Sequence, residues 1–293
     1  MIGATANAKI NLGLIVDRLR PDGYHELAGL FQSIGWSDRL ELGAGEDGIT
    51  GWDGGPVPED DGNTAWRAVE AVRRRLGSNR ALTLRLDKRI PVAAGLGGGS
   101  ADAAAALHLA CRMLGGPANL PGELAPGIGS DVPFCLTGGT AMVTGRGEVV
   151  TPVPAVLGYA LAVVVPPVEL STPVVYRTWD ELGGPQGTPI PVAAVPPGLR
   201  HHTPLRNDLY RAAVVVAPAV DEWRHELEER WGRSVAMSGS GPSLFAFFVD
   251  GDEAASAVLA TPRGARAAEA LAPVAEGWAL LPSPDDQAGD GTG

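Results

Sequence analysis

A glycine-rich segment carries the clearest chemical signal in the sequence. Four of the five positions from 95 to 99 are glycine (Gly95, Gly97, Gly98 and Gly99). An alanine-rich run begins directly after them, at Ser100. Glycine allows a ligand to approach the backbone closely. The first N–H groups of a helix have no partners within the helix, and the helix dipole adds partial positive charge there. A glycine turn that leads into a helix is therefore suited to bind phosphate.

The segment does not match the two commonest glycine-rich nucleotide motifs. No Lys-Ser or Lys-Thr pair follows the glycines, as the P-loop requires. Ser100 stands where the last glycine of G-x-G-x-x-G should be, and no acidic residue ends a second strand about 20 residues later. A tight turn without a ligand is the alternative interpretation of the segment.

Lys9 and Asp131 would complete the groups that phosphoryl transfer needs. That reaction requires a cradle for phosphates, a cation and a carboxylate that accepts the proton of the nucleophile. The glycine segment, Lys9 and Asp131 supply these in that order. A lysine ammonium beside Asp131 would keep the carboxylate ionised and ready to act as a base. Taken singly, either residue is an ordinary surface charge.

Other chemistries find little support. No G-x-S-x-G motif of serine hydrolases occurs, and His201-His202 has no Cys or acidic neighbours at metal-ligand spacing. The net charge of −11 argues against a nucleic-acid partner. No apolar run approaches the ~20 residues that span a bilayer. With two cysteines and no secretory layout at the start, we expect a cytoplasmic protein with reduced thiols.

The elements that must position these groups follow from periodicity and capping signals. Alternating apolar residues predict a strand over 8–16 with Lys9 on its second face. Asn63 is a candidate N-cap, and Gly77 ends the helix that follows it. Further strands are expected over 31–42, 82–86, 159–165, 233–237, 243–249 and 278–281, a hairpin over 138–153, loops over 47–61 and 128–133, and helices over 100–114, from 172 and 207, and over 254–259. This mixed order favours an α+β fold.

Three segments resemble the signature segments of the GHMP superfamily of small-metabolite kinases. They are Ala8–Leu12, Pro91–Ala101 and Met237–Ser243. The finer pattern is similar to the family of 4-diphosphocytidyl-2-C-methyl-D-erythritol kinases. It rests on further segments in the same order along the chain (Pro21–Leu27, Phe31–Ile34, Gly129–Pro133 and Asn207–Leu209). The resemblance extends from about residue 4 to residue 281.

The resemblance implies roles for individual residues. Lys9 and Asp131 fall on the catalytic pair. The ATP site falls on a set that includes Asn63 on the adenine side and Ser100 beside the phosphates and Mg²⁺ (Asn63, Pro91, Val92, Ala93, Ala94, Gly95, Leu96, Gly97, Gly98, Gly99, Ser100, Ala101). The substrate site falls on Asn11 at the hydroxyl end and on Tyr24, His25, Thr172 and Tyr176 at the cytidine end. Base stacking between Tyr24 and Tyr176 is a physical expectation of this placement.

The resemblance also implies a two-lobed α+β fold with its active site in the cleft between the lobes. We expect an ATP-binding domain over 1–153, a substrate-side domain over 154–281 and a disordered tail over 282–293. The expected reaction moves the γ-phosphoryl group of ATP, with Mg²⁺, to the 2-hydroxyl of 4-diphosphocytidyl-2-C-methyl-D-erythritol in the non-mevalonate isoprenoid precursor pathway. We expect no nucleic-acid or membrane partner, and we expect the protein to be a monomer or weak homodimer. A homoserine or mevalonate type of kinase, or an inactive metabolite sensor on the same fold, remain alternatives.

Overall fold

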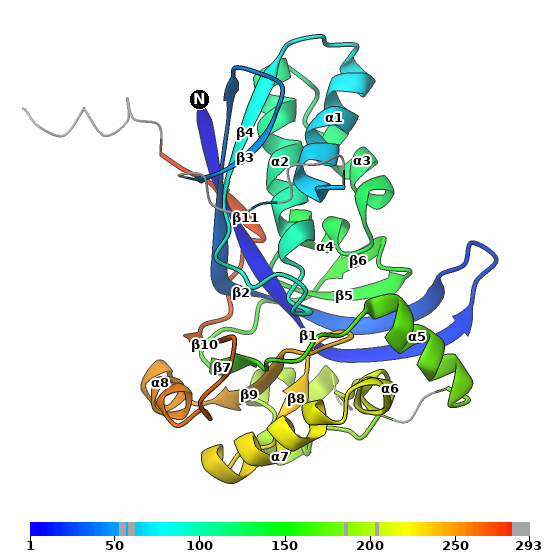
Figure 1. Cartoon of the computed structure of the whole chain (residues 1–293), viewed down its shortest axis with the longest axis vertical. Coiled ribbons are helices and arrows are strands. Elements are labelled where there is room, and N and C mark those ends of the chain that lie inside the picture. The colour runs from blue at the N-terminus through cyan, green and yellow to red at the C-terminus, as the bar shows by residue number, and fades with distance from the viewer. Residues whose placement is uncertain (53–56, 58–61, 185–186, 203–204, 283–293) are drawn as a thin grey trace, which may run out of the picture.

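The protein has two lobes, each built around one β-sheet (Figure 1). The computed structural model describes residues 1–52, 57, 62–184, 187–202 and 205–282. The predicted tail over 282–293 lies outside the described residues except for its first position. The predicted α+β, two-lobed fold is confirmed.

The first lobe has a seven-stranded sheet among the described residues, with helices on one face. Its path is β11-β1-β2-β4-β3, and β5 pairs with both β2 and β6. The strands are β1 (Ile2–Leu19), β2 (His25–Ala44), β3 (Gly48–Gly51), β4 (Leu82–Asp87), β5 (Thr140–Gly145), β6 (Val149–Pro152) and β11 (Trp278–Leu280). The helices are α1 (Thr64–Leu76), α2 (Gly98–Leu114), α3 (Leu120–Ile128) and α4 (Val132–Thr137).

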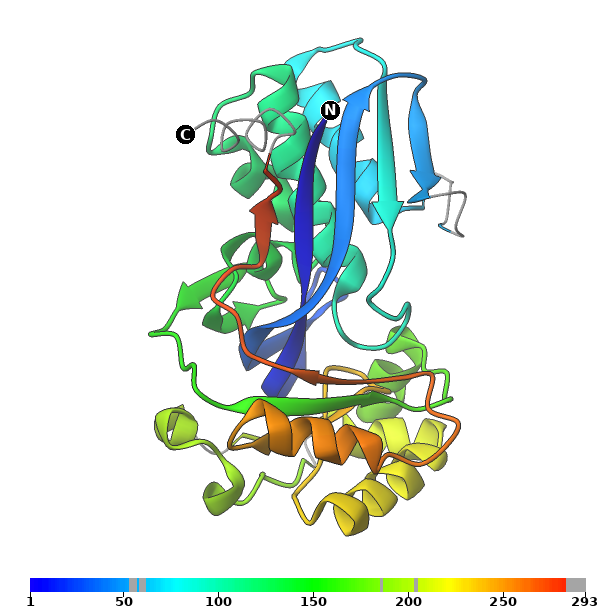
Figure 2. The same ribbon diagram turned by 90° about the vertical axis from the view of Figure 1, so that its left-hand side faces the viewer.

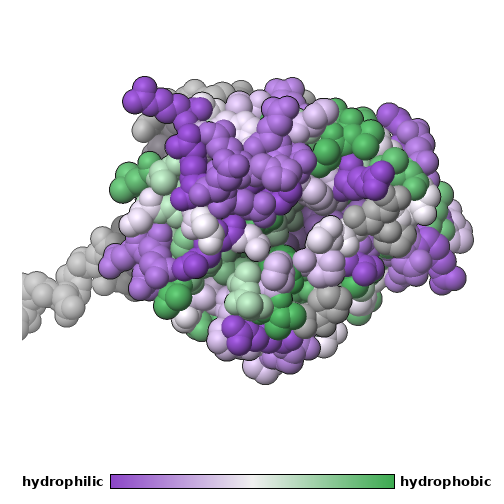
Figure 3. Space-filling model, turned by 90° about the horizontal axis from the view of Figure 1, so that it is seen from below, coloured by the Kyte–Doolittle hydropathy of each residue, from purple (hydrophilic) through white to green (hydrophobic). Residues whose placement is uncertain are grey.

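The second lobe has four strands in the order β10-β7-β9-β8, and Figure 2 shows them lying across the end of the first sheet. They are β7 (Ala160–Val165), β8 (Ala236–Met237), β9 (Leu244–Phe248) and β10 (Ala267–Leu271). The helices are α5 (Thr172–Glu181), α6 (Tyr210–Val216), α7 (Ala219–Trp231) and α8 (Gly251–Leu259), with short 3₁₀ helices η2 (Val192–Ala194) and η3 (Pro197–His202). The lower end of this lobe exposes hydrophilic and hydrophobic side chains in interspersed patches (Figure 3).

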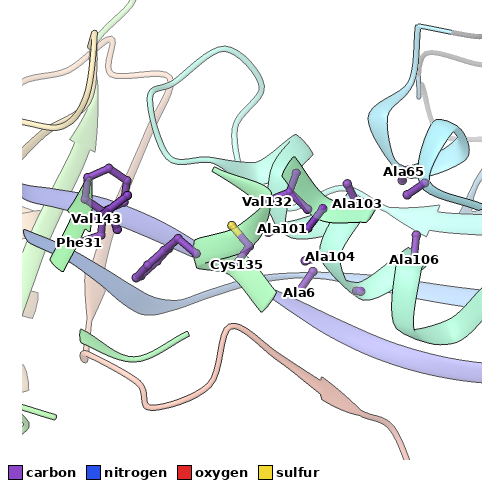
Figure 4. Packing of buried hydrophobic residues seen from close by; sticks show 14 of the residues in the cluster. Ala6, Phe31, Ala65, Ala101, Ala103, Ala104, Ala106, Val132, Cys135 and Val143 are labelled. Atoms are coloured by element: carbon purple, nitrogen blue, oxygen red, sulfur yellow. The ribbon is translucent and has the colours of Figure 1, made fainter. Parts of the chain in front are cut away.

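Helix α2 is the centre of the first lobe because its side chains are small. Six of its alanines are fully buried, and Figure 4 shows several of them between α1, α4 and β1 (Ala101, Ala103, Ala104, Ala105, Ala106, Ala110). A helix lined with alanine can approach its neighbours closely on several sides. The packing fixes the N-terminal end of α2, which the glycine segment precedes.

Strand β1 contributes to two hydrophobic cores. Its two ends contribute to the core beneath the helices (Ala4, Ala6, Leu14 and Val16). Its middle group, defined as the apolar residues Ala8, Ile10 and Leu12, packs against the second sheet. Register shifts between Asn7 and Lys9 and between Asn11 and Gly13 bracket this middle group. Irregularities of this kind re-aim side chains. Lys9 and Asn11, which lie between the two shifts, are consequently buried on the side where α2 and α4 begin.

Most elements lie where the sequence predicts them, but helix α3 has no counterpart among the predicted elements, and other elements differ as follows. The predicted loop over 47–61 contains β3 in its described part, and the expected loop over 128–133 runs into α4 at Val132. Strand β8 keeps only the last two residues of the strand expected over 233–237, and β10 has no counterpart among the predicted elements. The division into domains over 1–153 and 154–281 stays a prediction, while β11 pairs with β1 in the first sheet.

Candidate active site

Lys9 and Asp131 form an ion pair, although 121 positions separate them in the chain. The Lys9 Nζ atom lies 3.2 Å from Asp131 Oδ2, and the exposed fractions of the side chains are 5% and 31%. Lys9 Nζ also donates a hydrogen bond of 2.7 Å to Asn11 Oδ1 and lies 5.2 Å from the centre of the Phe31 ring. A buried ammonium needs such partners. They fix its position beside a carboxylate that remains accessible to a ligand.

The fold supplies one member of this pair from within a strand and the other from the start of a helix. Lys9 lies on the central stretch of β1, and Asp131 is the N-cap of α4, directly after α3 ends. The backbone N–H of Lys9 donates to Leu96 O at 2.9 Å, which ties β1 to the glycine segment. The ion pair is therefore held by three separate parts of the first lobe.

The glycine segment makes close approaches that other residues would not allow. Gly97 is the N-cap of α2 with φ +68°, and a Cβ added there would lie 2.8 Å from Lys9 Cγ. A Cβ on Gly95 would lie 2.7 Å from Ser238 O and 2.8 Å from Gly241 O. The C-terminal glycine turn around Ser238 thus packs directly on the central one. The α2 N-terminus, with its unpaired N–H groups, faces the space beside Lys9.

A cavity of about 640 Å³, called here the larger cavity, contains the ion pair. This volume suits a small-molecule ligand. All the predicted substrate residues line it together with Lys9, Asp131 and part of the glycine segment (Asn11, Tyr24, His25, Thr172, Tyr176, Gly95, Gly97, Ser100). The structure therefore brings together residues from both lobes that the sequence predicted for one site.

The aromatic end of the larger cavity lies between the start of β2 and helix α5. Tyr24 is 48% exposed, and the guanidinium of Arg146 lies 4.9 Å from its ring centre. The rings of His25 and Tyr176 lie 5.1 Å apart and are tilted. Burial, with a smaller contribution from the charge of Asp131, raises the pKa of the Tyr176 phenol, which therefore stays neutral. Stacking of a base between Tyr24 and Tyr176 stays a prediction.

A second cavity of about 420 Å³, called the smaller cavity, lies on the other side of the glycine segment. Asn63 lines it, as do ten consecutive residues of the predicted ATP segment, 91–100. Asn63 Oδ1 also caps α1, because it accepts hydrogen bonds from the N–H groups of Ala65 and Trp66. Ala101 lines neither cavity; it is fully buried within α2.

A buried charge cluster forms one wall of the smaller cavity. Lys88 Nζ donates to Asp38 Oδ2 at 2.5 Å and to Asp102 Oδ2 at 2.8 Å. Burial raises the pKa of Asp102 well above its usual value. Burial lowers the pKa of Lys88, but the two carboxylates outweigh it and the net pKa is raised. Asp38 Oδ1 accepts from the N–H groups of Arg89 and Ile90, so the cluster also fixes the entry to the glycine segment.

Gly95, Gly97 and Ser100 line both cavities. They form the junction between a smaller cavity and a larger one that contains a lysine–aspartate pair. A group bound in one cavity can thus reach a group bound in the other at this junction. The arrangement suits transfer of a group between two small molecules.

Comparison with known proteins agrees with this geometry. The N-terminal domain description of GHMP kinases matches residues 63–139, and the C-terminal description matches residues 199–264. The chain is 40% identical to 4-diphosphocytidyl-2-C-methyl-D-erythritol kinase of Cutibacterium acnes, with 95% of this chain and 96% of that protein covered. It is also 40% identical to the kinase of the same name from Salinispora arenicola, with 92% and 91% covered.

This chain belongs to the family of 4-diphosphocytidyl-2-C-methyl-D-erythritol kinases. A crystal structure of a 4-(cytidine 5'-diphospho)-2C-methyl-D-erythritol kinase superposes with a TM-score of 0.77 at 34% identity, covering 92% of this chain and 98% of that one. A homoserine kinase from Cytophaga hutchinsonii reaches a TM-score of 0.68 at 19% identity, over 96% and 97% of the two chains. The second likeness shows the shared fold alone.

Several cavity residues of this family member were missed by sequence reasoning. Arg146, Arg177 and Asp180 line the larger cavity, and Lys88 and Asp102 line the smaller one. Arg146 lies in the turn of the hairpin β5–β6, where a Gly-Arg-Gly sequence signals only the turn. Asp180 lies one turn of helix beyond Tyr176, which was a usable signal because such residues share a helix face.

None of the described helices is both long and apolar enough to cross a membrane. Within residues 1–52, 57, 62–184, 187–202 and 205–282, no group of three or more His, Cys, Asp or Glu side chains is arranged to hold a metal ion.

Proposed function

We propose that this protein is an ATP-dependent kinase that phosphorylates the 2-hydroxyl of 4-diphosphocytidyl-2-C-methyl-D-erythritol. The single observation that carries the proposal is the Lys9–Asp131 pair, 3.2 Å apart, at the junction of two cavities. One cavity fits the nucleotide donor, and the other combines aromatic and cationic groups that suit a cytidine diphosphate. The names of the relatives support the same substrate.

The reaction follows from the positions of these groups. Asp131 accepts the proton of the 2-hydroxyl as its oxygen attacks the γ-phosphorus of ATP. The new O–P bond forms as the bond between the γ-phosphorus and the oxygen that bridges it to the β-phosphate breaks. ADP is the leaving group. Lys9 orients Asp131 and offsets negative charge on the phosphoryl group, and the N–H groups at the start of α2 receive the phosphates.

Mg²⁺ would be held mainly by the ATP phosphates, with Ser100 as the protein ligand. Mg²⁺ often binds through substrate phosphates and water with few protein ligands. Ser100 lines both cavities, where a hydroxyl can reach the ion. When bound, the ion would offset the negative charge that develops on the phosphates.

The substrate would extend from the ion pair to the aromatic end of the larger cavity. Asn11 lies beside Lys9 at the hydroxyl end, while Tyr24, Tyr176 and Thr172 take the cytidine. Arg146 and Arg177 also line this cavity, and neither guanidinium forms an ion pair with a carboxylate in the part of the chain that the structure describes, although Arg146 donates to Pro126 O at 3.0 Å. Guanidinium groups whose charge no carboxylate neutralises are favourable partners for a diphosphate.

An ADP-release assay tests the proposal. Purified protein with ATP, Mg²⁺ and 4-diphosphocytidyl-2-C-methyl-D-erythritol should release ADP, and the Asp131→Asn variant should release it at least ~100-fold more slowly. Homoserine and mevalonate serve as competing acceptors. Turnover of either one, with none of the cytidine substrate, would reject the proposal in favour of another GHMP kinase. Nucleotide binding without turnover of any acceptor would favour an inactive sensor. Monomer or weak homodimer, and a cytoplasmic location, stay predictions.

A further inference from the structure

A hydrogen bond crosses the aromatic end of the larger cavity and joins the two lobes. His25 Nε2 lies 2.8 Å from Asp180 Oδ1, with His25 at the start of β2 and Asp180 near the end of α5. Both residues line the cavity. Figure 1 shows α5 beside the far part of the β1–β2 hairpin, where this contact is made. Asp180 therefore belongs to the cavity wall, although no role has been assigned to it above.

Helix α5 holds the His25 ring on more than one side. The ring lies 5.1 Å from the Tyr176 ring and meets the Trp179 ring edge-on at 5.4 Å. The His25 side chain is only 7% exposed, whereas that of Asp180 is 46% exposed. The ring is thus enclosed, and its polar contact is made through a carboxylate at the mouth of the cavity.

The carboxylate determines which ring nitrogen carries the proton. An ionised carboxylate only accepts hydrogen bonds, so Nε2 must be protonated when it pairs with Asp180. In the neutral ring, Nδ1 is then left with a lone pair and acts only as an acceptor. The two tautomers of histidine present opposite patterns to a ligand, and Asp180 selects one of them.

This selection matters for a pyrimidine base. Cytosine carries an exocyclic amine, which donates hydrogen bonds, whereas uracil carries a carbonyl at the same position, which accepts them. A ring nitrogen that only accepts can pair with the amine and opposes the carbonyl. A buried polar group that faces the wrong partner costs binding.

We propose that Asp180 is a positioning residue that sets the pyrimidine preference of the cavity by holding His25 in one tautomer and one orientation. The proposal rests on the proposed function, because it concerns the cytidine end of that site. It places Asp180 away from the phosphoryl-transfer step, since Lys9 and Asp131 make no contact with it. Loss of Asp180 should therefore act on substrate binding and leave turnover of bound substrate nearly intact.

A simple tie between the lobes predicts a different result. If the hydrogen bond only held β2 near α5, its loss would weaken cytidine and uridine ligands alike. A positioning role instead changes the ratio between them. The comparison of CDP with UDP separates the two roles.

The experiment measures calorimetric binding of CDP and UDP, together with kcat and KM for the cytidine substrate. For Asp180→Ala we expect CDP affinity and the KM of the substrate to worsen about tenfold or more, with UDP affinity and kcat within about threefold. Asp180→Asn should fall between Asp180→Ala and the native protein, because its amide oxygen can still accept the Nε2 proton. Glu181→Gln is the matched control, since Glu181 is the next residue of α5, is exposed and does not line the cavity.

The proposal would be overturned if Asp180→Ala weakened CDP and UDP binding equally. It would also be overturned if the ratio of the two affinities and the thermal unfolding midpoint both stayed at their native values. A fall in kcat without a rise in KM would overturn it as well. If any of these results is obtained but the native protein still turns over the cytidine substrate, only the role of Asp180 is rejected and the proposed function stands. A native protein that neither binds CDP nor turns over the substrate removes both.

Discussion

Replacing Gly97 with alanine should strongly reduce turnover, because the added side chain collides with Lys9. Gly97 has φ +68°, and its added Cβ would lie 2.8 Å from Lys9 Cγ and 2.9 Å from Lys9 Cε. Lys9 cannot withdraw freely. Its ammonium is held by Asn11 at 2.7 Å and by Asp131 at 3.2 Å, and its side chain is 5% exposed. The collision must therefore displace the lysine from its carboxylate partner.

The two costs of Gly97→Ala can be estimated separately. A left-handed backbone costs a residue with a Cβ about 1–2 kcal/mol, which lowers the free energy of unfolding by that amount. Displacement of Lys9 removes a preorganised cation from the transferring phosphoryl group. Loss of one such group costs ~2.7–4 kcal/mol in the transition state, or about 10²–10³ in kcat. The Cβ points at Lys9, so ATP affinity should change by less than about threefold.

Gly77→Ala is the matched control for backbone strain. Gly77 ends α1 with φ +64°, and an added Cβ there meets nothing within 4 Å. In urea titrations Gly77→Ala should lose only the free energy of the strained backbone, and Gly97→Ala should lose that amount and more because the buried Lys9 is displaced, while only Gly97→Ala should lose kcat in the ADP-release assay. If Gly97→Ala turned over substrate as fast as Gly77→Ala, the close packing of Lys9 on Gly97 would have no catalytic importance, and the reasoning would be refuted.

Further predictions address other parts of the two cavities. Tyr24→Ala should raise the KM for the cytidine substrate about 5–150-fold with little change in kcat, because stacking on a base contributes ~1–3 kcal/mol; an unchanged KM would exclude stacking on Tyr24. Arg146→Ala should weaken CDP binding more than cytidine binding in calorimetry if its guanidinium takes the diphosphate, and equal weakening would assign it to the base. Removal of Mg²⁺ with EDTA should abolish ADP release, and persistent turnover would remove the metal from the mechanism. The raised pKa of Asp102 means that the folded protein holds a proton that the unfolded chain releases above about pH 4, so this residue makes stability fall as pH rises. The free energy of unfolding of Asp102→Asn should accordingly decline less than that of the native protein as the pH rises above about 4, and parallel declines would contradict the shift.

The local elements of the fold were predictable where a short-range signal determines them. Asn63 caps α1 and Gly77 ends it in the left-handed conformation, as the sequence indicates. The helix after the glycine segment and its end at Gly115 were equally clear. Strand β10 was missed because none of its residues is fully buried, which leaves no strong apolar alternation to detect. Its place in the sheet depends on pairing with β7, a contact between distant parts of the chain.

The first strand shows where periodicity alone gives an incomplete answer. Even-numbered apolar residues along β1 correctly predict a strand. They do not show that Ala6 and Ile10 belong to different cores, because that depends on register shifts against β2. Lys9 was predicted on the second face of the strand, yet it is 4% exposed. The ion pair with Asp131 and the hydrogen bond to Asn11 explain how a lysine is tolerated there.

The ion pair also depends on the C-terminal glycine turn, which sequence alone could not connect to it. Asn11 Oδ1 accepts a hydrogen bond from Lys9 Nζ, and the Asn11 backbone N–H donates to Ser238 Oγ at 3.2 Å. Ser238 Oγ in turn lies 3.1 Å from Gly95 O, to which it donates. One hydroxyl of the second lobe therefore ties β1 to the glycine segment at the point where both meet the cavities. Asn11 and the glycine segment both contact Lys9, and the Ser238 hydroxyl contacts both of them. A substitution of Ser238 should therefore displace Lys9 even when no ligand is bound.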